Sequence, residues 1–248
     1  MSCQYTTSTH PGPAGRSDTQ HVPAPELALP HPPAAVIFDM DGLLLDSERV
    51  IAECFAATAE AQGAELPADI WLHMIGKSDP VCREMLTGYM GEARARQLLD
   101  IGKLRYAERA RAGIPHRPGV VELLDFLVRH DIPRAVGTTT RQPLASQKLA
   151  AAGLLGYFEV VVSSSDVARP KPAPDTYLRV AEQLGVEPAR CLVLEDSPTG
   201  VRAALAAGMT PIQIPDLLVP DETVRALGHR IVVSLIDVQQ LLAGMLAR

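Results

Sequence analysis

Short apolar runs alternate along the chain with longer segments that carry apolar residues at helical spacing, and this alternation strongly limits the possible folds. One such segment has Tyr177, Val180 and Leu184 on a single helical face. The runs have the length and continuous apolar character of buried parallel strands, and they cover residues 35–38, 134–137, 159–162, 191–194, 212–214 and 231–233. The alternation predicts an α/β fold: an open, doubly wound, Rossmann-like parallel sheet with helices on both faces.

One connection is too long for an ordinary crossover between neighbouring strands. About a hundred residues separate the first apolar run from the second, and residues 50–116 carry three or four helical patterns with no strand-like run. The Pro118-Gly119 pair marks the return to the sheet. We therefore expect a helical domain over residues 50–116, inserted into an α/β domain formed by residues 34–49 and 117–248.

The N-terminal 33 residues are rich in proline, glycine, serine and threonine and lack apolar periodicity, so residues 1–33 are predicted to be a flexible tail. The net charge of -6 and the absence of a basic stripe argue against nucleic-acid and anionic-membrane partners. No stretch approaches the roughly 20 apolar residues of a membrane-spanning helix, so we expect a soluble, cytoplasmic protein. The four cysteines show no CxxC spacing, which argues against a disulfide framework or a zinc site.

Polar side chains cluster where the predicted strands end. Carboxylates, hydroxyls and one ammonium group follow four of the strands: Asp39, Asp41, Thr138, Thr139, Lys171, Glu195 and Asp196. These strand ends converge on one crevice in a parallel sheet. Four carboxylates so close together need a compensating cation, and oxygen ligands without histidine or cysteine favour Mg²⁺. The sequence therefore predicts a magnesium site formed by Asp39, Asp41, Glu195 and Asp196.

The same cluster contains groups suited to phosphoryl chemistry. Asp39 and Asp41 can face one substrate, so one can attack phosphorus while the other moves the proton of the leaving oxygen. Thr138 and Lys171 are candidates for binding the phosphoryl oxygens. Lys171 is one of only four lysines in a chain with nineteen arginines, which points to a need for a compact charge.

These segments resemble the four motifs of the haloacid dehalogenase-like hydrolase superfamily, in the same order. They read Asp39-Met40-Asp41-Gly42-Leu43-Leu44-Leu45-Asp46, Thr138, Lys171-Pro172-Ala173-Pro174-Asp175 and Leu194-Glu195-Asp196-Ser197-Pro198-Thr199-Gly200. The inserted helices are similar to the cap of the subfamily that includes β-phosphoglucomutase and phosphatases of sugar phosphates and nucleotides. The resemblance covers nearly all of the chain from Val36 onward.

The resemblance implies a role for each motif residue. It makes Asp39 the nucleophile that forms an aspartyl-phosphate, and Asp41 the general acid and then the base. Asp39, the main-chain carbonyl of Asp41 and Asp196 would hold Mg²⁺, with Glu195 a direct or water-mediated ligand. Thr138 and Lys171 would bind the phosphoryl oxygens.

Further candidates lie around this cluster. Thr139, Glu48, Lys77 and Arg141 are candidate substrate contacts, whereas Lys103 and Lys148 lie in helical patterns and are expected to be solvated. Four residues are expected to play local structural roles: Asp175, Ser197 and Ser234 as helix N-caps and His73 in the inserted domain.

The function that we expect is Mg²⁺-dependent hydrolysis of a small phosphomonoester, a sugar phosphate or a nucleoside monophosphate, through an aspartyl-phosphate. A phosphomutase of the β-phosphoglucomutase type is the alternative, although Ile51 stands where that enzyme has a cap histidine. Phosphonate cleavage by a Lys77 Schiff base and dehalogenation are disfavoured. A phospho-metabolite sensor is the non-enzymatic alternative. The physiological substrate, the oligomeric state and the role of the tail stay open.

Overall fold

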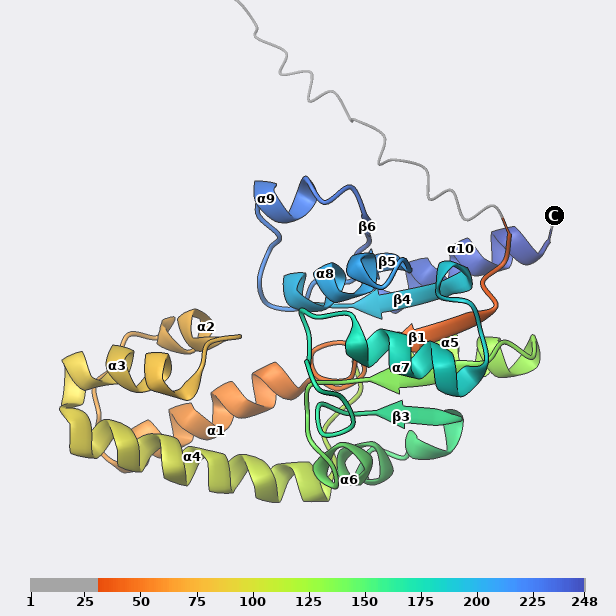
Figure 1. Ribbon diagram of the computed structural model, residues 1–248. Helices are drawn as coiled ribbons and strands as arrows, with labels where there is room; N and C mark the ends of the chain where they lie inside the picture. Colours follow the sequence, from red (N-terminus) through yellow and green to blue (C-terminus); the bar gives the residue numbers. More distant parts are fainter. Residues whose placement is uncertain (1–30, 248) are drawn as a thin grey trace, which may run out of the picture.

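The computed structural model describes residues 31–247 and contains one parallel sheet with strand order β3-β2-β1-β4-β5-β6 (Figure 1). The strands are β1 (Ala35–Phe38), β2 (Arg134–Gly137), β3 (Val160–Val162), β4 (Cys191–Glu195), β5 (Thr210–Gln213) and β6 (Arg230–Ile231). The chain moves outward from β1 in both directions, so the loops after β1 and β4 flank the point where strand order reverses. The predicted Rossmann-like α/β sheet is confirmed.

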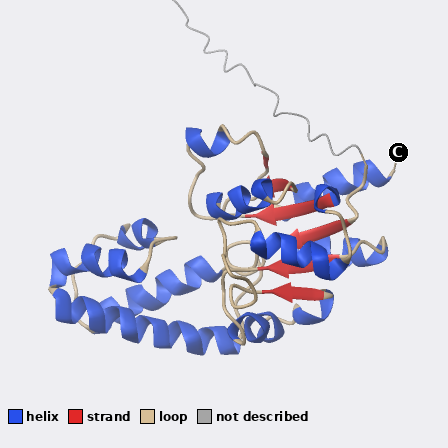
Figure 2. Cartoon of the chain, in the orientation of Figure 1, coloured by secondary structure: helices blue, strands red, loops and turns tan. Residues whose placement is uncertain are grey.

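Helices cover both faces of the sheet (Figure 2). Val36 and Phe38 of β1 pack on one side in a cluster that includes residues of α5 (Val120–Arg129), α6 (Leu144–Ala151) and α10 (Leu235–Leu246). The alternate residues Ala35 and Ile37 pack on the other side with α7 (Asp175–Leu184) and α8 (Pro198–Ala206). Because both faces of β1 are covered, its side chains are all apolar and fully buried. The short elements η1 (Leu155–Tyr157), η2 (Pro188–Arg190) and α9 (Glu222–Arg225) complete this part.

Four helices follow β1 before the chain returns to the sheet through α5: α1 (Ser47–Ala61), α2 (Ile70–Met74), α3 (Asp79–Met90) and α4 (Glu92–Ala112). They share an apolar cluster of their own, which includes Phe55, Met74, Cys82 and Leu98. Figure 1 shows them beyond the carboxyl ends of the strands. The first helix begins before the predicted boundary at residue 50, because the loop after β1 turns directly into it.

Two of the three predicted helix N-caps are confirmed, and the third is wrong. Ser197 caps α8 by accepting from the Gly200 N–H, and Ser234 forms a capping box with Asp237 at the start of α10. Asp175 is not a cap: it is the first residue of α7, and its carboxylate pairs with Arg169.

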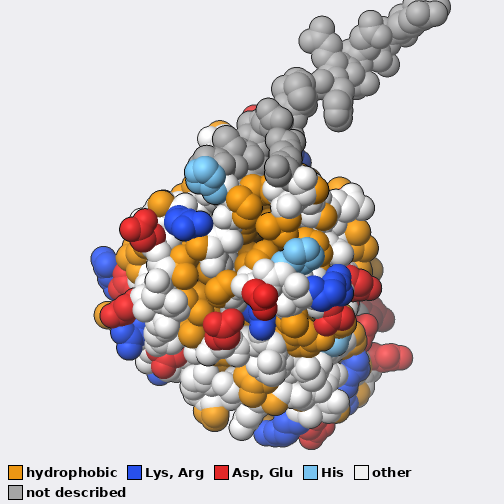
Figure 3. Space-filling view, turned by 90° about the vertical axis from the view of Figure 1, so that its right-hand side faces the viewer, with side chains coloured by type: hydrophobic (Ala, Val, Ile, Leu, Met, Phe, Trp, Pro, Cys, Tyr) orange, Lys and Arg blue, Asp and Glu red, His pale blue; other side chains and the backbone are white. Residues whose placement is uncertain are grey.

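The described structure includes only a small part of the predicted tail. Of the predicted tail, only residues 31–33 lie within the described structure. None of the described helices has the length and apolar character needed to cross a membrane. Figure 3 shows the face on the far side from α1–α4, where acidic and basic side chains are interspersed with hydrophobic ones.

Candidate active site

The loop after β1 places Asp39 and Asp41 at the carboxyl edge of the sheet. The Asp39 N–H donates to the Leu194 carbonyl at 2.9 Å, which fixes the start of this loop against β4. The loop then turns at Gly42, whose φ is +83°, and a Cβ there would lie 2.3 Å from the Asp196 Oδ2 atom. Only glycine meets both constraints without strain, so Gly42 allows the β1 loop to approach Asp196 closely.

Lys171 joins the loops after β1 and β4. Its Nζ lies 2.6 Å from Asp39 Oδ1 and 2.6 Å from Glu195 Oε1, and its side chain is almost fully buried. Burial alone lowers the pKa of Lys171, but the charges of Asp39 and Glu195 outweigh it and raise this pKa above its ordinary value. The ammonium group therefore stays charged and binds two buried carboxylates at once.

Glu195 is held from several sides. Tyr177 donates its hydroxyl hydrogen to Oε1 at 2.5 Å, and Ser197 donates from its N–H and its hydroxyl to Oε2 at 3.2 and 3.0 Å. The first turn of α8 also packs on this carboxylate, since a Cβ at Gly200 would lie 1.6 Å from Oε1. The Glu195 side chain is thus fixed, with little freedom to reorient.

Three carboxylates gather at this edge of the sheet. Asp39, Glu195 and Asp196 each offer an oxygen within 4.8 Å of the others. Burial raises the pKa of Asp39 to about 7 against the opposing effect of Lys171. Burial, followed by the charges of Asp39 and Glu195, raises the pKa of Asp196 well above its ordinary value. Lys171 alone therefore does not balance the three charges, and an oxygen-only, partly uncompensated cluster fits a hard divalent cation.

The Asp41 carboxylate lies apart from these three and has partners of its own. Thr140 donates its hydroxyl hydrogen to Asp41 Oδ2 at 2.6 Å, and Lys148 contacts Asp41 Oδ1. Of the four carboxylates predicted to form the metal site, the structure brings three together. Asp41 borders the same cleft with its side chain directed toward α6.

Lys148 corrects a sequence prediction. It was expected to be solvated, but its side chain is only 3% exposed, and its Nζ contacts both Asp41 and the Tyr106 hydroxyl, the latter at 2.9 Å. The physical reason is its place on α6, one residue before the buried Leu149 and three after the buried Ala145. Lys103, by contrast, is exposed and pairs with Asp79, as expected of a solvated lysine.

The threonine run after β2 divides into buried and exposed positions. Thr138 is buried, and its Oγ1 accepts from the Thr140 N–H at 3.1 Å. Thr139 is exposed and lines the cleft beside Asp39 and Lys171. Arg141 is exposed and lies outside the described wall of that cleft. Sequence reasoning did not assign a role to Thr140, although it belongs to the same run.

These groups border one cleft of about 510 Å³, which we call the main cleft. Its wall combines Asp39, Asp41, Lys171 and Asp196 with three residues from the α1–α4 region: Glu48, Ile75 and Gly76. Lys77 lines a different cavity among α1–α4, so the structure does not bring it to the main cleft.

The loop after β5 forms a further part of the wall, which sequence reasoning missed. Asp216 in this loop is contacted by Arg49 at 2.7 Å and by Arg117 at 2.8 Å, and Arg49 also binds Asp46 at 2.6 Å. These ion pairs tie the start of α1 to the sheet. Only the three-dimensional arrangement brings these distant residues together.

Glu48 lies in the first turn of α1 and lines the main cleft beside the charged cluster. Burial, followed by the charges of Asp41 and Asp216, raises the pKa of Glu48 from 4.5 to about 7. The folded protein therefore holds this proton more tightly than the unfolded chain does. The contribution of Glu48 to the free energy of unfolding falls as the pH rises from about 4.5 to about 7.

Glu48→Gln should remove this pH dependence. In metal-free buffer we expect the variant to be more stable than wild type by about 1 to 3 kcal/mol at pH 8, with a much smaller difference at pH 5. Denaturant unfolding at the two pH values measures this, with the exposed Glu60→Gln on the same helix as control. If the free energies of unfolding of Glu48→Gln and wild type changed with pH in the same way, the ionised form of Glu48 would not be disfavoured in the folded protein.

Comparison with known proteins identifies the family. A model of the family described as haloacid dehalogenase-like hydrolase matches residues 33–208. The chain belongs to this family. It is 36% identical over 182 residues to a phosphorylated carbohydrates phosphatase of Thermotoga maritima, an alignment that covers 72% of this chain and 83% of that protein.

Two other proteins are similar to this chain. The chain is 34% identical over 194 residues to a probable pseudouridine-5′-phosphatase of Drosophila melanogaster, covering 73% of this chain and 80% of that protein. A family hydrolase of Deinococcus radiodurans, solved with bound phosphate and sodium, is similar with a TM-score of 0.73 and 30% identity. That match covers 86% of this chain and 96% of the solved one.

Proposed function

We propose that this protein hydrolyses a small phosphomonoester, a sugar phosphate or a nucleoside monophosphate, through an aspartyl-phosphate formed on Asp39. The protein is a phosphoric monoester hydrolase. The observation that carries the proposal is the buried Lys171, which binds Asp39 and Glu195 beside Asp196 at the point where strand order reverses. The names of the phosphatases to which the chain is similar support the same reaction class.

The reaction proceeds in two displacements. An oxygen of Asp39 attacks phosphorus, the ester bond breaks, and Asp41 gives its proton to the departing alcohol oxygen. Water then attacks the phosphorus of the aspartyl-phosphate, Asp41 takes a proton from that water, and inorganic phosphate leaves. Asp39 and Asp41 thereby return to their starting states, and one water is consumed per ester.

The phosphoryl oxygens need compensating groups in both displacements. Lys171 lies next to Asp39 and supplies a fixed positive charge, and Thr139 supplies a hydroxyl from the cleft wall. The Thr138 hydroxyl accepts one hydrogen bond and keeps its own hydrogen for donation. We assign binding of the phosphoryl oxygens to Lys171, Thr138 and Thr139.

The carboxylate cluster is proposed to hold Mg²⁺. Asp39, Asp196 and the main-chain carbonyl of Asp41 would be its ligands, with Glu195 bound directly or through water. The bound ion would neutralise charge on the phosphoryl oxygens. Fixation of Glu195 by Tyr177, Ser197 and Lys171 keeps one side of the site rigid.

Mg²⁺ binding can be tested without measuring activity. A ligand that binds only the folded state at a hundred times its Kd stabilises it by about 2.7 kcal/mol. We therefore expect millimolar Mg²⁺ to raise the Tm of the wild type in calorimetry, and Asp196→Asn to lose most of this rise. The exposed Asp100→Asn serves as control and should keep it. An undiminished rise in Asp196→Asn would place the ion elsewhere.

The helices α1–α4 are proposed to form a cap domain, over residues 50–116, that closes on the main cleft and excludes water. Ile75 and Gly76 of the cap line this cleft together with Glu48 in the first turn of α1. Lys77 is separated from them, which removes the support for a Schiff-base phosphonatase. The three described cysteines, Cys54, Cys82 and Cys191, are free and buried, and we propose a cytoplasmic location on that ground.

A kinetic panel tests the proposed reaction. Purified protein is expected to release phosphate from members of a panel of sugar phosphates and nucleoside monophosphates with Mg²⁺ and to stop when the metal is chelated. The panel includes β-glucose 1-phosphate, from which we expect free phosphate and no 6-phosphate, since Ile51 occupies the position of the mutase histidine. Formation of the 6-phosphate would reveal a phosphomutase. No metal-dependent release from any compound would overturn the proposal.

A further inference from the structure

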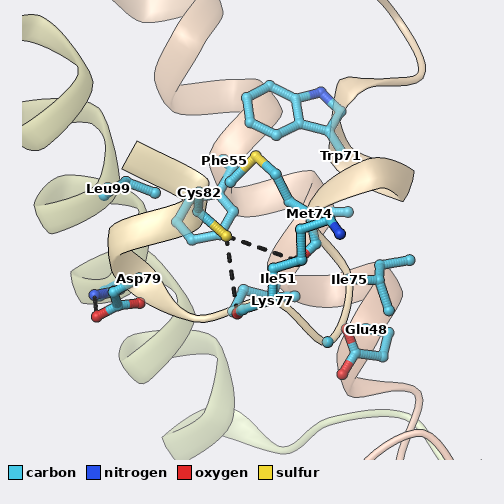
Figure 4. Close-up of a pocket in the computed structure, with 13 residues that line it drawn as sticks. Glu48, Ile51, Phe55, Trp71, Met74, Ile75, Lys77, Asp79, Cys82 and Leu99 are labelled. Atoms are coloured by element: carbon cyan, nitrogen blue, oxygen red, sulfur yellow. Dashed lines mark hydrogen bonds and ion pairs between the residues drawn. The ribbon is translucent and has the colours of Figure 1, made fainter. Parts of the chain in front are cut away.

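A second cavity, of about 250 Å³, lies within the cap (Figure 4). We call it the cap cavity. Its wall is formed mainly by apolar side chains from α1, α2 and α4: Ile51, Ala52, Phe55, Trp71, Met74 and Leu99. Phe55 and Trp71 stack with their ring centroids 6.1 Å apart. A cavity of about 150 Å³ lined by aliphatic and aromatic groups holds a benzene molecule, so this one has room for a ring with a substituent.

The cap cavity adjoins the main cleft. Glu48, Ile75 and Gly76 line both spaces. In Figure 4, Glu48 and Ile75 lie at one end of the cavity and Trp71 at the other. The cap cavity therefore lies next to the space that the alcohol of an ester bound at Asp39 would enter.

Three of the polar residues on this wall, Asp79, Lys103 and Cys82, already have partners; Glu48 and Lys77 are the others. Lys103 and Asp79 pair with each other, and both are exposed. The Cys82 thiol contacts the main-chain oxygens of Met74 and Lys77, and burial raises the pKa of this thiol, so it stays neutral. Against the apolar side chains of the wall a sugar would lose hydrogen bonds to water without regaining them, whereas an apolar group gains from burial.

We propose that the cap cavity binds the leaving group of the substrate, and that this leaving group carries an apolar part, a ring or an alkyl chain. The inference rests on the proposed hydrolysis of a small phosphomonoester and gives its alcohol an apolar part that plain sugar phosphates lack. Among phosphomonoesters of primary alcohols, those with an apolar alcohol are preferred to those of plain sugars.

A series of primary alkyl phosphates of increasing chain length, with glucose 6-phosphate alongside, tests this. The leaving oxygens of the series are chemically alike, so differences in kcat/KM report on binding of the alcohol. We expect kcat/KM to rise by up to about fourfold per methylene from ethyl to hexyl phosphate, as full burial of each methylene would give. Ala52→Leu should abolish this rise by filling the cavity. The exposed Ala57→Leu is the control.

The possible outcomes distinguish a failure of the apolar leaving-group inference from a failure of the proposed hydrolysis. A flat series, or glucose 6-phosphate preferred to hexyl phosphate, overturns the apolar leaving group while hydrolysis itself stands. A rise that persists in Ala52→Leu places the binding site outside the cap cavity and also overturns the inference. No release from any ester would instead be a failure of the proposed function.

A different observation supports a second inference, at Asp41. Both oxygens of its carboxylate are held, Oδ1 by Lys148 and Oδ2 by Thr140, so the carboxylate cannot rotate freely. The Lys148 ammonium also contacts the hydroxyl of Tyr106 on cap helix α4. Lys148 is buried on a helix of the α/β domain and touches none of Asp39, Glu195 and Asp196 among the described contacts.

We infer that Lys148 is a positioning residue for Asp41 that also links this carboxylate to the cap. Removing the ammonium leaves Asp41 with Thr140 alone and lets its side chain leave the geometry needed for proton transfer. Misplacing a reacting group in this way can cost up to about a hundredfold in rate. The loss should fall on steps in which Asp41 must donate a proton.

Leaving-group dependence separates positioning from a purely structural role. In single-turnover experiments, Lys148→Met should slow phosphoryl transfer from hexyl phosphate by about 10- to 100-fold. Transfer from p-nitrophenyl phosphate, whose leaving group needs no proton, should change much less. Lys148→Arg should recover part of the loss, and Gln147→Met, at an exposed position of the same helix, is the control. Equal losses with both esters, or no loss, would overturn the inference.

Discussion

Asp39→Asn is expected to lower kcat by at least about 10⁴-fold, the scale on which removal of a catalytic nucleophile acts. The amide cannot attack phosphorus, so the first displacement is lost. The fold should persist because the amide oxygen can still accept the hydrogen bond from Lys171 at the place where Asp39 Oδ1 lies, 2.6 Å from Nζ. Circular dichroism and the Tm would verify this.

The matched control is Asp100→Asn. Asp100 is exposed on α4, far along the chain from the strand-end loops, and the same chemical change there should leave kcat within about twofold of wild type, as for a surface substitution. Asp39→Ala should repeat the loss seen with Asp39→Asn. Substantial turnover by both Asp39 variants, at unchanged Mg²⁺ dependence, would show that another group attacks phosphorus.

Lys171→Met is expected to cost about 3 to 5 kcal/mol in the free energy of unfolding, because removal of one partner leaves buried charges without compensation. The substitution strips the cation from two carboxylates, and the Glu195 carboxylate is fully buried. Activity should fall as well, since the phosphoryl oxygens lose their fixed positive charge. Urea unfolding in metal-free buffer measures the stability change.

Lys103→Met provides the comparison for this second prediction. Lys103 also pairs with an aspartate, but this pair is accessible to solvent, with the two side chains 41% and 69% exposed, and such pairs contribute at most about 1 kcal/mol. A loss of stability in Lys171→Met no larger than that in Lys103→Met would mean that the buried carboxylates are neutral and need no cation. That result would also weaken the case for a divalent ion at the same cluster.

The sheet and the charged cluster could be predicted because they depend on short-range patterns. Polar residues follow the apolar run of each strand, directly for Asp39 and Asp196 and later in the loop for Lys171, so the sequence predicts all three at one edge of the sheet. The structure brings these three side chains to the wall of one cleft. The local pattern did not reveal the role of Thr140, which lies two residues after Thr138 and donates a hydrogen bond to Asp41.

The residues that sequence reasoning missed depend on packing between distant elements. Lys148 reads as a surface lysine until α6 is placed beside the loop after β1, where its ammonium reaches Asp41. Tyr106 meets Lys148 only because α4 passes along α6. Lys77 was expected near substrate because it follows a loop of the cap, but that loop turns it toward the cap cavity. No periodicity in the sequence encodes these orientations.

Trapping of the covalent intermediate tests the central claim most directly. The enzyme is mixed with Mg²⁺ and a turned-over ester, quenched in acid within milliseconds, digested and mapped by mass spectrometry. We predict a phosphoryl group on the peptide that contains Asp39, which forms and decays at rates that account for turnover. A phosphoryl group on another residue, or steady turnover with no phosphorylated peptide at any time, would contradict the assignment of Asp39 as nucleophile.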